Sequence, residues 1–497
     1  MHKRSDTLGA GSLRSGGLTA ISLFLVSAAS AVIGVVIARE FGRTEQTDGL
    51  LAAYGIFLVV VVAAQAIRVA VLPQLARAMD AGRLAGELAG YAIALVLIST
   101  PSIVVAELWA DPLSRLLTGD ESAVAAETAE YVLRWLVVAG VMQLFAALAA
   151  SGLAALDSYG IAAAGYAGGS AAGLVVIVAR VEPDGVRAIA WGVTLSALIA
   201  VLVPTIALAV RASRARMPRK AARPSGLPFR DRTRAFGVAA TLPIALQLLY
   251  VVSLPFAAEL GTGATTTFVY GYLAASSIVA VTAGSLGLVT AVPLARGRLT
   301  VEEMTRHLVS ASWIALVGVG AAAGVFAVAG GVFVRAVLGA SYGGEVGADL
   351  GRLVVALSPW MVASVAVTLA FPLTFVAGRT RRLPWIAVGA LALQLPLSWI
   401  GVALLDLYGL ALALACSTAV VLLALLTALG ALTGTARGIA LAGAIVGGLT
   451  LASFLPPSLL LDATATAVVG LVLYGGLLLV LRPRALTGSW EYLRALR

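Results

Sequence analysis

The chain has 497 residues, of which 60% are hydrophobic and only 12% are charged. This composition excludes a soluble globular domain, in which about a quarter of the residues are charged. A formal net charge of +10 would favour a nucleic-acid partner in a soluble protein. In a membrane protein the same excess is explained by loops with basic residues on the cytoplasmic side, so we expect no nucleic-acid partner.

Chemistry-bearing residues are scarce. Cys416 is the single cysteine, His2 and His307 are the only histidines, and there is no asparagine. The chain therefore has almost none of the residues that disulfides, metal clusters and catalytic triads require. The chain also has no GxxxxGK[ST] nucleotide-binding loop, which argues against an ATP-driven pump. We expect neither an enzyme nor a metal or other cofactor.

The N-terminus begins with a short basic segment, residues 1–17, followed by the apolar run 18–38. This run is too long for a signal-peptide core, so we predict a retained first helix. Apolar blocks of about 20 residues, each long enough to cross a bilayer, continue along the chain. We predict an all-α polytopic membrane protein with about fourteen transmembrane helices. The predicted spans are 18–38, 49–72, 88–109, 128–152, 160–180, 186–210, 235–258, 266–292, 308–334, 352–377, 383–405, 408–433, 438–457 and 463–481.

The second span starts at Thr47-Asp48-Gly49 and reaches Leu72-Pro73. Thr47 is a plausible cap for this helix, and Pro73 is expected to end it. A similar run opens at Tyr270-Gly271 about 220 residues later and leads to Pro293. We interpret this as an internal duplication, as in many transporters whose substrate path lies between repeats.

The duplication predicts two pseudo-symmetric six-helix lobes followed by two further helices. We expect an N-terminal lobe at 1–210, a basic linker at 211–234, a C-terminal lobe at 235–433, and helices 13 and 14 with a cytoplasmic tail at 434–497. The linker carries many arginines against one acid, Asp231. It is expected to anchor the topology and contact anionic lipids, or to dock a phosphorylated lipid headgroup.

The positions of the basic residues predict the orientation. If the N-terminus is cytoplasmic, most of the 34 lysines and arginines fall in cytoplasmic segments. Because cytoplasmic loops carry this excess, we expect both termini in the cytoplasm. The predicted outer side holds Arg39, Arg43, Arg115, Arg180, Arg187, Arg335 and Arg352.

Arg68 is the first candidate for a substrate contact. It lies about one turn inside the predicted cytoplasmic end of the second span, and Gln65 lies one turn before it. An ionisable group inside a membrane is a functional hypothesis by default. Arg68 either meets an anionic phosphate in a central cavity or extends its side chain to the interface.

Three further charged residues lie near the predicted outer side. Arg134 follows Glu130 by four residues, a spacing that favours a local ion pair over a substrate contact. Asp48 begins the second span, where an acid also suits a helix N-terminus. Arg39 ends the first span, where a cation suits a helix C-terminus. Each of these three residues is a candidate for substrate binding, and the alternative is that it serves only the local structural role given above.

The seventh and eighth spans are unusually polar. Gln247, Tyr250 and Ser253 follow one face of the seventh, and Tyr270 and Tyr272 open the eighth. Such residues either bond to neighbouring helices or line a water-filled cleft. We take Gln247, Tyr250, Tyr270 and Tyr272 as candidates for sugar contacts.

Three short runs resemble the N-terminal signature of the lipid II flippase (MurJ/MviN-like) family: Ala38 to Gly42, Thr47 to Gly49, and Leu72-Pro73. This family belongs to the multidrug, oligosaccharidyl-lipid and polysaccharide exporters. The chain departs from the family in its first helix, where 26–36 carries no charge, and Arg68 is displaced toward the cytoplasm relative to the family's cavity arginine.

The resemblance implies a flippase that moves a lipid-linked glycan precursor such as lipid II across the bacterial cytoplasmic membrane by alternating access. Arg68, with Arg39 and Arg134, would then meet the phosphates. A cation-coupled multidrug exporter of the same superfamily is an alternative, although convincing buried acids are lacking. A non-transporting scaffold of cell-wall assembly, in contact with cell-wall synthesis proteins, is another.

Overall fold

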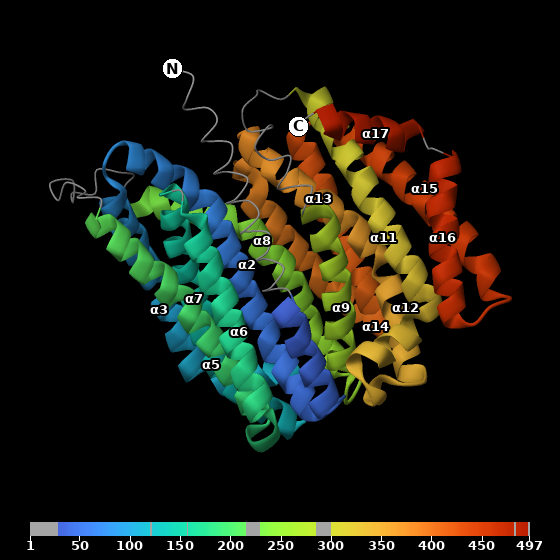
Figure 1. Cartoon of the computed structure of the whole chain (residues 1–497), viewed down its shortest axis with the longest axis horizontal. Coiled ribbons are helices and arrows are strands. Elements are labelled where there is room, and N and C mark those ends of the chain that lie inside the picture. The colour runs from blue at the N-terminus through green and yellow to red at the C-terminus, as the bar shows by residue number, and fades with distance from the viewer. Residues whose placement is uncertain are drawn as a thin grey trace. The chain divides into compact units, whose positions relative to one another are not determined.

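The computed structural model describes residues 28–119, 122–156, 158–214, 229–284, 300–481 and 484–495 (Figure 1). Within these ranges the regular secondary structure is helical. The chain divides into two compact units, Met1–Val251 and Val252–Arg497, and each is described by itself.

The first unit contains helical residues 28–41 and six further helices, together with most of a seventh, α8, which continues past Val251. The helices after residue 41 are α2 (Glu45–Asp80), α3 (Leu84–Leu108), α4 (Ala110–Thr118), α5 (Ala123–Ala155), α6 (Tyr159–Asp184), α7 (Val186–Arg214) and α8 (Phe229–Ala258).

Helix α5 is the centre of the first unit, and α2 and α7 pack against it. At Gly49 of α2 the two backbones meet so closely that an added Cβ would lie 2.1 Å from the carbonyl oxygen of Ala125. Gly173 of α6 and Gly192 of α7 allow an equally close approach, because a Cβ on either glycine would overlap the backbone carbonyl oxygen of the other. Small residues at membrane helix contacts permit this approach, which increases dispersion contacts where there is no hydrophobic driving force.

The second unit contains the rest of α8 and the helices to the C-terminus. They are α9 (Ala264–Val279), η2 (Ala280–Gly284), α11 (Val301–Leu338), η3 (Ala340–Tyr342), α12 (Glu345–Ala356), α13 (Ser358–Val376), η4 (Thr380–Arg382), α14 (Leu383–Leu429), α15 (Leu432–Ser458), α16 (Ala463–Leu481) and α17 (Arg484–Ala495). Helix α11 packs against α12, α15 and α16, and Trp313 is at the centre of one of its buried clusters.

Helix α14 is a hairpin of two spans. Its backbone leaves helical geometry at Leu405 and Asp406, and Asp406 has a positive φ of 50°. Across this turn the backbones of Gly401 and Gly409 touch, and a Cβ on Gly401 would lie 2.5 Å from the carbonyl oxygen of Gly409. Residues eight apart in one straight helix would be about 12 Å apart. The turn falls where the sequence predicts the boundary between spans 383–405 and 408–433.

Two glycine turns, one in each unit, lie 220 residues apart, while the internal duplication itself stays a prediction. Gly119 ends α4 with a φ of 69°, and Gly339 ends α11 with a φ of 101°. After these turns α5 begins at Ala123, whereas α12 begins at Glu345 and continues as α13 after a break at Leu357. Gly271 of α9 meets Leu353 of α12, as Gly49 of α2 meets α5.

Twelve helices of the described residues are long and apolar enough to cross a membrane. The chain is therefore a multi-pass membrane protein. These twelve count the α14 hairpin once, and of the first predicted span, 18–38, only residues 28–38 are described. The figure of fourteen spans stays a prediction.

Two predictions about α2 are wrong. The helix starts at Glu45 with Thr44 as its N-cap, whose hydroxyl accepts from the amide of Thr47, so Thr47 is not the cap. The helix also continues through position 73 to Asp80 and does not stop there. Proline is tolerated in transmembrane helices because neighbouring groups satisfy the freed carbonyl.

The lobe boundary was predicted in the linker 211–234, while the two compact units divide within α8. Residues 215–228 of the linker lie outside the described residues, and its flanks extend α7 and α8. Arg211, at the start of the linker, donates a hydrogen bond to the hydroxyl of Ser158. Pro293 of the predicted second copy also lies outside the described residues. The division into lobes at 210 and 235 stays a prediction.

Candidate functional site

Arg68 lies on α2, half-buried, with its guanidinium over an aromatic ring of α6. Its Cζ lies 5.6 Å from the centroid of the Tyr166 ring. Tyr166 is itself partly buried against Ala150, Leu153 and Ala162, so the ring is held in place. A cation–π contact of this kind contributes about 0.5–2 kcal/mol, more when water is excluded. Arg68 of α2 is therefore held against α6 by this contact.

No carboxylate lies within ion-pair distance of Arg68 in the part of the chain that the structure describes. A tyrosine ring does not neutralise the charge of the guanidinium. A cation inside a membrane segment is costly unless it is paired. A guanidinium has five N–H donors that suit phosphate oxygens, and binding of an anion by Arg68 stays a prediction.

Gln65 lies one turn before Arg68 on the same helix. Its side chain is exposed, whereas the neighbouring Ala64, Ala66 and Ile67 are buried. Gln65 and Arg68 thus form a short polar stretch in the apolar middle of the helix, as the sequence predicts from their spacing.

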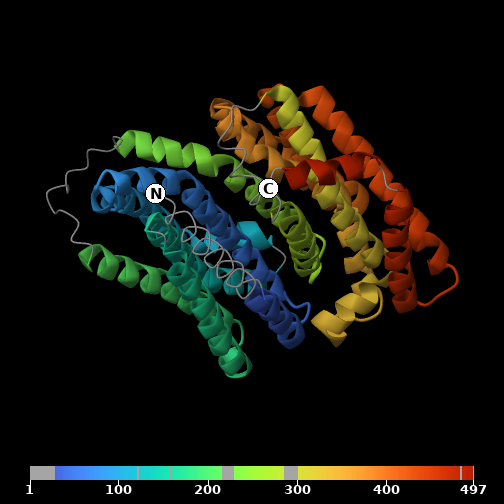
Figure 2. The same cartoon turned by 45° about the horizontal axis from the view of Figure 1, so that its top comes forward.

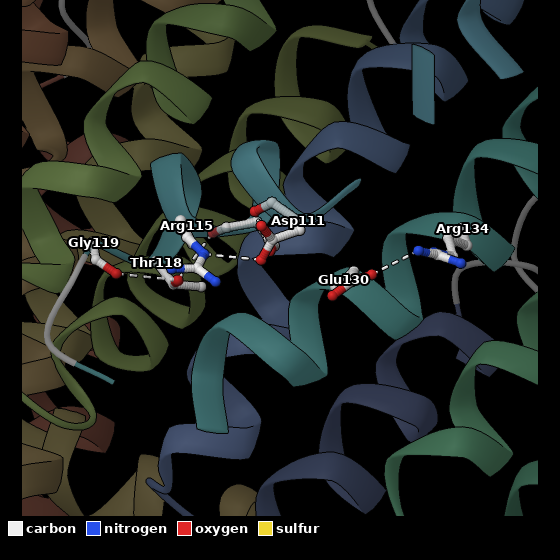
Figure 3. Close-up of polar contacts among 7 residues, drawn as sticks. Asp111, Arg115, Thr118, Gly119, Glu130 and Arg134 are labelled. Carbon is white, nitrogen blue, oxygen red and sulfur yellow. Dashed lines mark hydrogen bonds and ion pairs between the residues drawn. The ribbon is translucent and has the colours of Figure 1, made fainter. Parts of the chain in front are cut away.

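Arg134 is placed differently, in a local ion pair (Figure 3). Its guanidinium lies 2.6 Å from Glu130 on the same helix and 3.9 Å from Glu107 on α3. The side chain is 46% exposed. Both glutamates offset its charge, as the spacing of Glu130 and Arg134 suggests. The role of Arg134 in binding substrate stays a prediction.

We expect Arg134→Ala to change the free energy of unfolding by less than about 1 kcal/mol, because exposed ion pairs contribute little. Thermal unfolding of the purified variant checks this expectation. A loss of several degrees in Tm would show that the pair with Glu107 is essential for the packing of α3 on α5.

Asp48 and Arg39 lie near the start of α2 and the end of helix 28–41. Asp48 is 8% exposed in the first turn of α2, where a negative charge suits the helix dipole. Arg39 is exposed. Arg115, on the same predicted outer side, pairs with Asp111 at 2.8 Å (Figure 3). The substrate roles of Asp48 and Arg39 remain predictions.

The four candidates for sugar contacts are all buried. Gln247 and Tyr250 lie on α8 in the first unit. Tyr270 and Tyr272 lie on α9 in the second unit, where Tyr270 packs against Tyr342 at 5.7 Å and Tyr272 packs against Trp360 at 5.0 Å between ring centroids. These ring contacts are those of core packing, so sugar binding by the pair on α9 would require the rings to separate.

No protein-family model matches the chain, and no curated protein matches it in sequence. Solved structures do. A lipid II flippase MurJ in an inward closed conformation matches with a TM-score of 0.68 at 14% identity, over 96% of this chain and 99% of that one. An inward-facing multidrug resistance MATE family transporter of the MOP superfamily matches with a TM-score of 0.62 at 17% identity, over 83% and 94%. A MOP superfamily transporter from Pyrococcus furiosus matches with a TM-score of 0.60 at 15% identity, over 87% and 96%.

The chain has the MOP fold. The similarity to the lipid II flippase, which the sequence predicts from the N-terminal runs, is confirmed for the fold. The three solved structures are those of a flippase and of two transporters. At this level of identity the MOP fold does not by itself identify the substrate. The class of substrate is therefore inferred from the side chains of this chain.

Sequence reasoning missed one buried polar cluster in this MOP fold. The Nε2 of Gln394 on α14 donates to the hydroxyls of Ser253 on α8 and Ser398 on α14, both at 3.0 Å. All three side chains are fully buried. The sequence places Ser253 on a polar face, but the signal for its partner is only a single glutamine with a serine four residues later in an apolar run.

We expect Gln394→Ala to lower the free energy of unfolding by about 1–3 kcal/mol, because it removes two hydrogen bonds and leaves a cavity. Thermal unfolding in detergent checks this against Thr368→Ala, whose exposed hydroxyl bonds only to its own helix. Equal Tm values for the two variants would contradict a structural role for the cluster.

The described residues contain no group of three or more histidine, cysteine, aspartate or glutamate side chains that could hold a metal ion. The structure brings Arg68 of α2 together with Tyr166 of α6, and Gln65 lies one turn before Arg68 on α2. Arg68 and Tyr166 are the candidate site of the first unit, and anion binding by Arg68 stays a prediction.

Proposed function

We propose that the chain is a flippase for a lipid-linked glycan whose pyrophosphate carries negative charge, such as a lipid II-like precursor. The observation that supports this most is Arg68, a half-buried cation on a transmembrane helix that is held by Tyr166 and offset by no carboxylate among the described residues. Phosphate oxygens would supply the missing negative charge. The MOP fold, which the lipid II flippase shares, supports the same class of substrate.

The proposed mechanism is alternating access. Two repeats of the same helix succession would rock about a path between them, as in other transporters built from repeats. The glycan headgroup would follow the path while the isoprenoid chain stays in lipid. The charge bias supports both termini in the cytoplasm of a bacterial cell.

Complementation tests this proposal. A bacterial host is depleted of its own lipid II flippase while the chain is expressed, and growth is measured. Growth is the expected result. Failure to grow, with the protein correctly inserted in the membrane, would contradict a lipid II-like substrate.

A cation-coupled multidrug exporter is the second candidate. It is favoured by Asp48, a buried carboxylate in a transmembrane helix, and by the similarity to the MATE family transporter. Such an exporter would raise the resistance of a sensitive host to cationic drugs, and Asp48→Asn would abolish that resistance. A flippase would give no such resistance.

A further inference from the structure

Each unit contains a turn between two helical spans in which one residue has the same uncommon backbone conformation. In the first unit α6 and α7 lie side by side (Figures 1 and 2), and Gly185 joins them with a φ of 58° and a ψ of −135°. In the second unit Asp406 joins the two spans of α14 with a φ of 50° and a ψ of −133°. A positive φ is strained for a residue with a side chain, and among the described residues Asp406 is the one non-glycine residue that has it. The second unit thus keeps the turn without a glycine.

A cation and an aromatic ring meet beside the turn of the first unit. Arg187 lies in the first turn of α7, and its Cζ is 5.3 Å from the centroid of the Tyr131 ring on α5. The hydroxyl of Tyr131 also accepts a hydrogen bond of 3.0 Å from the Nε1 of Trp191 on α7. These contacts hold the beginning of α7 against α5.

The second unit has the same two kinds of side chain beside its turn, in exchanged places. Tyr408 lies two residues after Asp406, at the beginning of the second span of α14. The guanidinium of Arg352 on α12 interacts with the Tyr408 hydroxyl and also pairs with Asp349 of its own helix. Here the earlier helix supplies the arginine and the later helix supplies the tyrosine.

The two pairs correspond position by position. Arg352 lies 221 residues after Tyr131, and Tyr408 lies 221 residues after Arg187. The two turns beside them are separated by the same number of residues along the chain. An arginine attracts a tyrosine through its ring or its hydroxyl, whichever of two neighbouring helices supplies the cation. Exchange of the two residues therefore preserves the contact between the helices.

We propose that these pairs are two copies of one structural device, the outer clasp, which is Tyr131 with Arg187 in the first unit and Arg352 with Tyr408 in the second. Each copy lies on the predicted outer side and keeps the beginning of the later span against the earlier helix. The outer clasp makes the outer end of each unit move as one body. It does not rest on the proposed substrate, because no residue of either pair is a candidate for a substrate contact.

Hydrogen exchange on the purified full chain in detergent tests the outer clasp of the second unit. Arg352 is suited to replacement because its side chain is 61% exposed. Arg352→Tyr removes the cation, and Tyr408→Arg places two cations beside each other. Each single variant should speed exchange about two- to fivefold in peptides that cover α12, as expected for the loss of one exposed cation–aromatic contact. The variant with both changes recreates the arrangement of the first unit and should exchange at the wild-type rate.

Controls separate the outer clasp from a general effect of lost charge. Arg381→Tyr makes the same chemical change at an exposed arginine of η4 and should leave the exchange of α12 as in the wild type. In the first unit, Arg187→Met should speed exchange at the beginning of α7 about two- to fivefold. Arg115→Met is its matched control, because Arg115 pairs with Asp111 of its own helix, and it should leave α7 unchanged.

Wild-type exchange of α12 in both single variants would overturn the proposal. So would a variant with both changes that exchanges as fast as the faster single variant, because the two residues would then not act as a pair. If Arg187→Met left the beginning of α7 unchanged, the two contacts would not be copies of one device. None of these outcomes depends on transport, so they leave the proposed function to its own test.

Discussion

Gly49→Ala is expected to lower the free energy of unfolding of the protein by about 1–3 kcal/mol or more. The Cβ of an alanine at this position would lie 2.1 Å from the carbonyl oxygen of Ala125. The obstructing atom belongs to the backbone, so no rotamer change relieves the overlap. Helices α2 and α5, which pack along much of their length, would have to separate near the start of α2.

Thermal unfolding of the purified protein, together with its yield in the membrane fraction, checks this prediction. Gly447→Ala on α15 is the matched control, because nothing lies within 4 Å of a Cβ at Gly447. Glycine in a helix costs roughly 0.5–1 kcal/mol relative to alanine, so the control should be neutral or slightly stabilising. A Gly49→Ala protein as stable as the wild type would contradict the close contact of α2 with α5.

Arg68→Ala is expected to reduce transport of a lipid-linked glycan by about 10- to 100-fold, because a charge-assisted hydrogen bond is worth about 1.5–3 kcal/mol. The folded protein should persist, since the cation–π contact with Tyr166 contributes little to overall stability. The measurement is transport at equal amounts of inserted protein.

Conservative variants separate charge from packing. Arg68→Lys keeps the charge but loses the planar fork, so partial transport is expected. Tyr166→Phe keeps the ring under Arg68 and should transport nearly as well as the wild type. Arg115→Ala is the matched arginine control, because Asp111 already pairs with that charge at 2.8 Å and Arg115 is not a candidate for a substrate contact. Equal losses for Arg68→Ala and Arg115→Ala would contradict a particular role for Arg68.

The spans could be predicted from the sequence because a bilayer requires long apolar runs, and α5, α7 and the α14 hairpin follow those runs. The short helices could not be predicted in this way. Helices α4, α12 and α17 are amphipathic and have 9 to 12 residues, too few for a hydropathy window to detect. The stop at Pro73 was wrong because proline alone does not end a helix that its neighbours support.

The candidate site was predictable to the extent that its chemistry is local. The pair of Glu130 with Arg134 follows from a spacing of four residues, and the structure contains it. Tyr166 is almost a hundred residues from Arg68 and could not be paired with it by any periodicity. The hydrogen bond of Gln394 to Ser253 could not be predicted for the same reason, because it joins two helices that are far apart in the chain.

Transport by the purified protein tests the central claim most directly. The wild type and Arg68→Gln are reconstituted in liposomes with a fluorescent lipid-linked pyrophosphoryl glycan, and the label that reaches the opposite leaflet is measured over time. The proposed function predicts rapid flipping by the wild type and a loss of about 10-fold or more in the variant. Absence of flipping by the wild type, or equal flipping by the two proteins, would contradict a flippase that binds its anionic substrate through Arg68.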